Sequence, residues 1–457
     1  MIRRAWGTCP DAAWQSLTTI RRRWLVAAFA ASAIFAGGVA LFSTDAVHRL
    51  WGTMAACAYA LAALAVMAWK ARGTDLALML SFCGALLAPL AWMAWSGQQQ
   101  PEVTVVARSA MSLVHHGTPY EDSSALAGTQ NPNSYNPYLP VMALFGMPRA
   151  LFGGGPLTDP RLWFGVVFLL IFWRALHAGG ARDVSRWALF VAASPVVAFE
   201  LAVGGTDVPM VAFLCLGFAL LWQSRPELAG LALGIAAAMK ATAWPALLVA
   251  FTLLVVRDGR RAAAVFTAVA VGVLVVCVGP FLLHDPGSLV RNTIMFPLGL
   301  AKVTSQASSP LPGHVLADTG RLGHAVVVAL LAVADLAVGL SLVVRPPRTV
   351  PQATMRLVIA LTISFVLAPS TRFGYFIYPA TLVIWVLVAM AGRIRPDAEG
   401  PPPSRFEGWR RAPEPQPESQ PAALARVGPG ASRGAGTRRR KAHQVRVCAG
   451  STSVTGV

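Results

Sequence analysis

Long apolar runs constrain this 457-residue chain more than any other feature of its sequence. They extend over about 17 to 20 residues, the length at which an α-helix crosses the hydrocarbon core of a bilayer. Hydrophobic residues make up 55% of the sequence and charged residues only 13%, which is more apolar surface than a soluble core would bury in such runs. The alternating segments of roughly ten residues that mark a transmembrane β-barrel are missing. The sequence therefore predicts an all-α, polytopic integral membrane protein.

About twelve spans are predicted, with both termini on the cytoplasmic side. Lys and Arg gather in alternate loops, as the positive-inside rule requires, and this explains the net charge of +18 without a nucleic-acid partner. Residues 228–256 are too long for one straight span and contain Lys240 and Pro245, which indicates a hairpin of two short helices. Residues 138–152 are interrupted by prolines and indicate an interfacial or re-entrant helix. The predicted spans are 24–42, 51–69, 76–95, 162–178, 187–203, 208–222, the two short helices of 228–256, 262–283, 322–344, 357–368 and 376–391.

Composition divides the chain into three parts. Residues 1–23 are a polar, basic cytoplasmic segment, and residues 24–392 form the transmembrane domain, with outer loops at 96–161 and 284–321. Residues 393–457 are rich in Pro, Gly, Ser, Arg and Ala and have no apolar period, which predicts a disordered, basic cytoplasmic tail. Its TRRRK cluster (437–441) is expected near anionic lipid headgroups. The six cysteines show no CxxC or Cys/His spacing, so neither a zinc site nor a disulfide framework is indicated.

Charged residues from distant segments are predicted to meet at the outer membrane face. Charges at a membrane face cost free energy unless they are paired, solvated or used. Glu102, which follows the third span and opens a long polar segment, is the candidate catalytic carboxylate. A carboxylate beside several cations suits an anionic, lipid-linked substrate, because cations hold phosphate and a carboxylate accepts a proton from a hydroxyl. The candidate substrate-binding residues are Asp207, Lys240, Arg372, Tyr120, Tyr138 and His314.

Each candidate also has a purely structural interpretation. Glu102 at a helix start would be favoured by the helix dipole. Asp207, with Pro209 two residues later, has the chemistry of an N-cap. Lys240 would snorkel to the interface, Arg372 would pair with lipid headgroups, and the tyrosines would anchor the chain at the interface. The functional interpretation rests on the convergence of these residues at one face and not on any one of them.

Four segments carry a resemblance to a known family. EVTVVARSAMSLVHHGTPY (102–120) starts with an acidic residue at the end of a span and closes in Gly-x-x-Tyr, here Gly117 and Tyr120. NSYNPYLPVMALFGMP (133–148), GGTDVPMVAFLCLGFALL (204–221) and AGLALGIAAAMKATAWPALL (229–248) follow in order. They resemble the Tyr-Pro-Pro stretch, the Gly-x-x-Asp segment and the small-residue helix ending in Lys and Pro of the GT-C membrane glycosyltransferases. Within this class the similarity is to the family-87 and polyprenol-phosphate-mannose-dependent mannosyltransferase group, over roughly residues 76–392.

The resemblance implies a GT-C-like fold and a specific reaction. The enzyme would move a sugar, often mannose, from a polyprenyl-phosphate donor to a glycan or glycolipid acceptor at the outer face, with inversion at the sugar carbon. Glu102 would be the general base, and Lys240 and Arg372 would hold the donor phosphate. The family position usually holds Asp, so the side chain of Glu102 is one methylene longer. Since no Asp-Asp motif accompanies it, a divalent metal stays an open question.

Two further classes of function stay open at the level of sequence. A transporter or flippase of a lipid-linked or polar solute would place ionisable groups near the bilayer midplane, often at broken helices in repeated halves. The chain shows no internal repeat and most of its charges lie at span ends, but Lys240 lies inside an apolar run and fits a transporter. A non-catalytic membrane scaffold would tolerate any change at Glu102.

Overall fold

The computed structural model describes residues 10–69, 72–301, 303 and 305–393. Within these residues every regular element is a helix, and the β-structure is limited to one isolated bridge between Ser308 and Thr371. The predicted all-α class is therefore confirmed. The first nine residues and the tail after residue 393, with its TRRRK cluster, lie outside the described residues, so the disordered tail stays a prediction.

The long α-helices follow the predicted apolar runs, and short 3₁₀ or π segments occur at some of the junctions. The α-helices are α1 (Pro10–Phe42), α2 (Ala46–Ala68), α3 (Gly73–Ser81), α4 (Ala88–Ser96), α5 (Pro101–His116), α6 (Ser123–Gly128), α7 (Met147–Phe152), α8 (Pro160–Gly179), α9 (Val184–Ala192), α10 (Pro195–Val203), α11 (Val208–Trp222), α12 (Pro226–Met239), α13 (Trp244–Arg257), α14 (Arg260–Cys277), α15 (Gly279–His284), α16 (Pro286–Val290), α17 (Pro312–Ala317), α18 (Arg321–Val344), α19 (Val350–Leu367) and α20 (Ile377–Arg393). The 3₁₀ helices are η2 (Pro132–Ser134), η3 (Pro140–Gly146), η4 (Pro156–Thr158), η5 (Ala241–Ala243) and η7 (Phe373–Phe376), and the π-helices are η1 (Phe82–Leu87) and η6 (Arg291–Met295).

Eight helices in the described part of the chain are long and apolar enough to cross a membrane. The bent pair of α9 and α10 makes a ninth if it counts as one span. Helices α11, α12 and α13 are apolar but have only 14 or 15 residues. All these elements fall where the sequence predicts spans, so a multi-pass membrane protein is confirmed. The figure of about twelve crossings stays a prediction, because three of the predicted spans are short.

The hairpin predicted in residues 228–256 is present. Helices α12 and α13 are separated by Lys240 and the short helix η5. Lys240 contacts Asp207 just before the start of α11, with 2.7 Å between Nζ and Oδ1. At the far end of the hairpin, Arg257 donates to the carbonyl of Leu221 near the end of α11. Helix α12 thus runs antiparallel to α11, and α13 returns parallel to it.

A bend of 61° separates α9 from α10. Ser194 has extended backbone angles and precedes Pro195, which lacks a donor N–H and disfavours a helical conformation in the residue before it. The bend directs α10 toward the start of α5, where the N–H of Gln100 donates to the carbonyl of Val203 at 3.0 Å. One predicted span therefore consists of two helices, and the second of them reaches the functional site.

Small residues let neighbouring helices approach closely. A Cβ at Gly230 on α12 would lie 2.6 Å from the carbonyl oxygen of Phe266 on α14, and one at Gly52 on α2 would lie 2.6 Å from the carbonyl oxygen of Ala36 on α1. Without a hydrophobic driving force between helices in lipid, such close backbone packing is a main source of association. These contacts hold the scaffold that positions the site.

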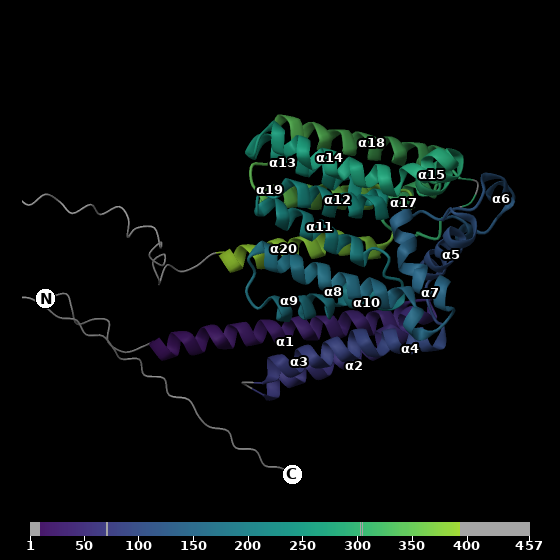
Figure 1. Ribbon diagram of the computed structural model, residues 1–457. Coiled ribbons are helices and arrows are strands. Elements are labelled where there is room, and N and C mark those ends of the chain that lie inside the picture. The colour runs from purple at the N-terminus through teal and green to yellow at the C-terminus, as the bar shows by residue number, and fades with distance from the viewer. Residues whose placement is uncertain (1–9, 70–71, 302, 304, 394–457) are drawn as a thin grey trace, which may run out of the picture. The chain divides into compact units, whose positions relative to one another are not determined.

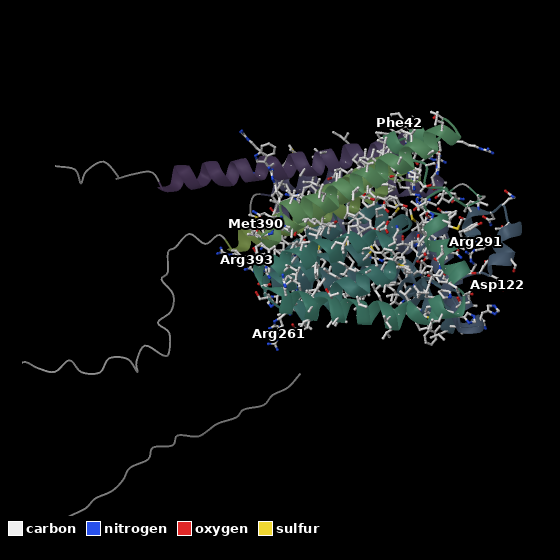
Figure 2. All side chains as sticks on the ribbon, turned by 90° about the horizontal axis from the view of Figure 1, so that it is seen from above. Phe42, Asp122, Arg261, Arg291, Met390 and Arg393 are labelled. Atoms are coloured by element: carbon white, nitrogen blue, oxygen red, sulfur yellow. The ribbon has the colours of Figure 1, made fainter. Side chains whose placement is uncertain are left out.

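The short elements gather at one end of the long helices. Figure 1 shows α5, α6, α15 and α17 together at that end. In Figure 2, Asp122 and Arg291 lie at this end, whereas Arg261 and Arg393 lie at the opposite end. The candidate functional site belongs to the end that carries α5.

Candidate functional site

A cavity of about 280 Å³ lies among residues of α5, α10, the α12–α13 break and the loop after α19. Five of the seven residues that the sequence singles out line it: Glu102, Tyr138, Asp207, Lys240 and Arg372. They come from segments far apart in the chain, so the predicted convergence of these residues is present in the structure. Tyr120 and His314 do not line the cavity.

Glu102 forms an ion pair with Arg372 at the cavity wall. Pro101 opens α5, so Glu102 lies in the first helical turn, as expected. The Oε1 atom of Glu102 pairs with Nη1 of Arg372. The Oε2 atom is buried and has no hydrogen-bond partner in the described part of the chain. One carboxylate oxygen is therefore held by a cation, and the other is free to accept a hydrogen bond from a ligand.

Arg372 lies in a loop that its neighbour fixes. The backbone N–H of Thr371 donates to the carbonyl of Ala307 at 2.9 Å, and its hydroxyl donates to the carbonyl of Phe365 at 2.7 Å. Burial alone would lower the pKa of Arg372. The Glu102 carboxylate, together with smaller contributions from Tyr375, Tyr138 and Glu200, offsets this, and the pKa lies above its ordinary value. Arg372 is a permanent cation of the cavity.

Asp207 and Lys240 form a second, buried ion pair. The turn before Asp207 uses Gly205 with a φ of 72°, a conformation that glycine adopts without strain. The Oδ1 atom of Asp207 accepts hydrogen bonds from Lys240 Nζ and the Tyr378 hydroxyl, both at 2.7 Å. Although Asp207 occupies the N-cap position of α11, its side chain makes no capping bond. Asp207 is thus the N-cap residue, as the structural interpretation expects, but its carboxylate pairs with Lys240 and does not cap the helix.

Lys240 does not snorkel toward the interface. It has an extended backbone between α12 and η5, which directs its side chain into the site. Besides Asp207, its ammonium group lies 4.7 Å from the ring centroid of Tyr375 and 5.6 Å from that of Tyr138, within cation–π range. The snorkelling interpretation is wrong, since the charge is held inside the fold.

Tyr120 and His314 support residues that line the cavity. The Tyr120 hydroxyl donates to the carbonyl of Tyr138 at 3.0 Å, and burial raises the pKa of Tyr120, so it stays a neutral donor. His314 Nδ1 donates to the carbonyl of Pro369 at 2.9 Å, and Pro369 lines the cavity. We therefore regard both as positioning residues. Tyr138 itself accepts a hydrogen bond from Thr206 at 3.3 Å.

Two acidic residues that line the cavity, Glu200 on α10 and Asp335 on α18, are not among the predicted candidates. Each lies inside an apolar run that the sequence analysis treated only as a span. The signal was present, since a lone carboxylate within a membrane span is a candidate for function. Asp335 accepts a hydrogen bond from Ser364 at 3.0 Å.

Metal ligands do not cluster in the described part of the chain. No group of three or more His, Cys, Asp or Glu side chains there is arranged to hold a metal ion. Two carboxylates of the cavity, those of Glu102 and Asp207, face cations instead. This arrangement suits a ligand that carries both an anionic group and hydrogen-bond donors.

Comparison with protein families gives a match over residues 136–369 to the model described as glycosyltransferase family 87. The chain belongs to glycosyltransferase family 87. The family resemblance drawn from the sequence is thus confirmed. The matched region includes Tyr138, Asp207 and Lys240, whereas Glu102 and Arg372 lie outside it.

Among solved structures, this family-87 protein is similar to ArnT from Cupriavidus metallidurans, whose crystal structure contains bound undecaprenyl phosphate. The two chains are 19% identical, with a TM-score of 0.44. The match covers 71% of this chain and 60% of the ArnT chain, so the family-87 protein spans about three fifths of the length of ArnT. No curated protein matches the sequence.

Proposed function

We propose that this glycosyltransferase moves a sugar, with mannose as the first candidate, from a polyprenyl-phosphate donor to a hydroxyl of a glycan or glycolipid acceptor. Glu102 is the general base, and the reaction inverts the configuration at the anomeric carbon. The donor class and the sugar follow from the family resemblance, and the residue roles follow from the chemistry of the cavity.

The observation that carries the proposal is the state of the Glu102 carboxylate. Its Oε1 atom is paired with Arg372, and its Oε2 atom is buried without a hydrogen-bond partner in the described part of the chain. A buried acceptor without a partner is costly, so it is suited to accept a hydrogen bond from a ligand. In the proposed reaction Oε2 takes the proton of the acceptor hydroxyl as that oxygen bonds to the anomeric carbon.

The cations of the cavity are proposed to stabilise the leaving phosphate. As the bond between the anomeric carbon and the phosphate oxygen breaks, negative charge grows on the leaving polyprenyl phosphate. Arg372 and Lys240 line the same cavity as Glu102 and would stabilise this charge. In the structure, the carboxylate of Glu102 pairs with Arg372 and that of Asp207 pairs with Lys240.

The reaction is proposed to take place at the outer face of the cytoplasmic membrane, with both termini inside. The end of the helices that carries Arg261 and Arg393 lies opposite the end of Asp122 (Figure 2). Basic loops favour the cytoplasmic side. The cavity belongs to the other end, which supports an outward-facing site.

The test is transfer of radiolabelled mannose from polyprenyl-phosphate mannose to membrane lipid and glycan acceptors. Membranes that contain the native chain are compared with membranes that contain equal amounts of Glu102→Gln, which keeps the shape of the side chain and removes the base. Transfer by the native chain, reduced about 10²- to 10⁴-fold in the variant, supports the proposal. Equal transfer by both proteins would exclude Glu102 as the base. Asp207 would then be the next carboxylate to test.

The rival function is a transporter or flippase of a lipid-linked or polar solute. Its main support in the sequence is Lys240, which in the structure is paired with Asp207 at the α12–α13 turn. Reconstituted vesicles loaded with polyprenyl-phosphate mannose separate the two functions. Net movement of the lipid between leaflets without transfer to an acceptor would favour the transporter.

A further inference from the structure

Glu200 is a carboxylate of the cavity that the proposed reaction does not use. It lies on α10, in the apolar segment Pro195–Val203, and it is half-buried at the cavity wall. Glu102 and Asp207 each pair with a cation, and Asp335 accepts a hydrogen bond from Ser364. Within the described residues, Glu200 has neither an ion pair nor a hydrogen bond of its side chain. Since an unpaired carboxylate in a membrane segment costs free energy, Glu200 is suited to receive hydrogen bonds from a ligand.

Gly374 makes room for this carboxylate. A Cβ at residue 374 would lie 2.7 Å from Cδ and 3.0 Å from Oε2 of Glu200. The φ angle of Gly374 is not positive, so the backbone conformation itself does not require glycine. A side chain at residue 374 would instead displace the Glu200 carboxylate, which is the flexible end of its side chain. The loop next to Arg372 therefore packs directly against this carboxylate.

The chemistry of the surroundings selects the class of ligand. A phosphate would be repelled by Glu200 and attracted by Lys240 and Arg372, which line the same cavity. A divalent cation would need further ligands, and no such cluster occurs among the described residues. Hydroxyl groups are neutral hydrogen-bond donors, so a carboxylate can accept hydrogen bonds from them without a cation nearby. A sugar joined to a phosphate provides both kinds of group.

We propose that Glu200 binds hydroxyl groups of the donor sugar, while Lys240 and Arg372 hold its phosphate. This assignment rests on the proposed function, because it takes the donor to be a polyprenyl-phosphate sugar. It adds a sugar-binding residue to the proposed site.

The test compares two lipids with the same prenyl chain, a polyprenyl phosphate and the corresponding polyprenyl-phosphate mannose. Each is titrated into the purified full-length protein in detergent, and Kd is taken from the shift in Tm. The native protein should bind the mannose-linked lipid more tightly than the bare phosphate. In Glu200→Gln this preference should fall about tenfold, as expected for loss of hydrogen bonds to a charged acceptor. Binding of the bare phosphate should not weaken.

Two further variants control the result. Gly374→Ala keeps the charge of Glu200 but displaces it, and it should also lose the preference for the mannose-linked lipid. Asp335→Asn removes another acidic charge from the same cavity and should keep the preference. Equal preference in the native protein, Glu200→Gln and Gly374→Ala would overturn the assignment. So would stabilisation by Mg²⁺ or Mn²⁺ that Glu200→Gln abolishes, since Glu200 would then be a cation ligand.

A failure of the proposed donor is distinguishable from a failure of the Glu200 assignment. If neither lipid stabilises the native protein, the polyprenyl-phosphate donor is wrong. The Glu200 assignment is then tested by comparing the Tm of the native protein and of Glu200→Gln without added lipid. A carboxylate kept for a ligand and unpaired in the fold predicts a higher Tm for Glu200→Gln than for the native protein. A lower Tm would show that Glu200 serves the fold, and would overturn the assignment.

Discussion

Arg372 holds one oxygen of the Glu102 carboxylate and leaves the other without a protein partner in the described part of the chain. This ion pair joins the first turn of α5 to the loop between α19 and η7, and both residues line the cavity. In the proposed reaction, the free oxygen of Glu102 takes the proton of the acceptor hydroxyl while Arg372 stays beside the carboxylate.

Shortening the proposed base by one methylene should reduce transfer without abolishing it. In Glu102→Asp the carboxylate is kept but withdrawn from Arg372 and from the acceptor. Misplacement of a reacting group by about 1 Å costs on the order of 10²-fold in rate. Initial rates of mannose transfer should therefore rank the native protein above Glu102→Asp, and Glu102→Asp above Glu102→Gln. Equal rates in the native protein and in both variants would show that the carboxylate itself is not required.

Removing the cation beside the base should weaken donor binding and leave Glu102 unpaired. Arg372→Gln is expected to raise KM for the polyprenyl-phosphate donor by about tenfold or more, because a charge-assisted hydrogen bond to phosphate is lost. Arg372→Lys keeps the charge but not the planar fork, and it should recover part of the loss. Steady-state kinetics with varied donor measure both. An unchanged KM for the donor in Arg372→Gln would show that Arg372 does not bind the donor phosphate.

Breaking the buried pair of Asp207 and Lys240 should destabilise the fold. Asp207→Asn or Lys240→Met alone leaves an uncompensated buried charge, for which a loss of about 3–5 kcal/mol is expected. The double variant should lose less free energy of unfolding than the sum of the two single losses, since neither charge is then left unpaired. Chemical or thermal unfolding in detergent measures the cycle. Simple additivity would show that the two side chains do not interact in the native protein.

Loss of the Tyr120 hydroxyl should affect stability more than chemistry. Tyr120→Phe removes the hydrogen bond to the Tyr138 carbonyl at 3.0 Å and keeps the ring. The expected cost is about 1 kcal/mol in the free energy of unfolding, because a buried acceptor loses its partner. Transfer should stay within a few-fold of the native rate. A loss as large as that of Glu102→Gln would instead make Tyr120 a catalytic residue.

The proposed orientation predicts which end of the helices is accessible from outside. Asp122→Cys and Arg261→Cys lie at opposite ends and are both exposed (Figure 2). In a background without the six native cysteines, a membrane-impermeant maleimide should label the variant Asp122→Cys in intact cells. The variant Arg261→Cys should react only after permeabilisation. The reverse pattern would place the cavity on the cytoplasmic side.

The sequence alone determined the membrane class, the position of the helices and most of the charged residues of the site. These properties are local, because a run of apolar residues and a break at Lys240 and Pro245 are visible without knowledge of any partner. The hairpin of α12 and α13 followed from length and charge alone. The family also followed from short segments in a fixed order, and the match to family 87 confirms it.

Only the tertiary structure decided which residues meet. The pairs of Glu102 with Arg372 and of Asp207 with Lys240 join segments far apart in the chain, and no local pattern specifies such contacts. Glu200 stands out in the sequence only as a lone carboxylate in an apolar run, and it is packing that brings it from α10 against Gly374. Local hydropathy encodes where a helix lies in the membrane. The chemistry of the cavity depends on the side chains that packing brings together.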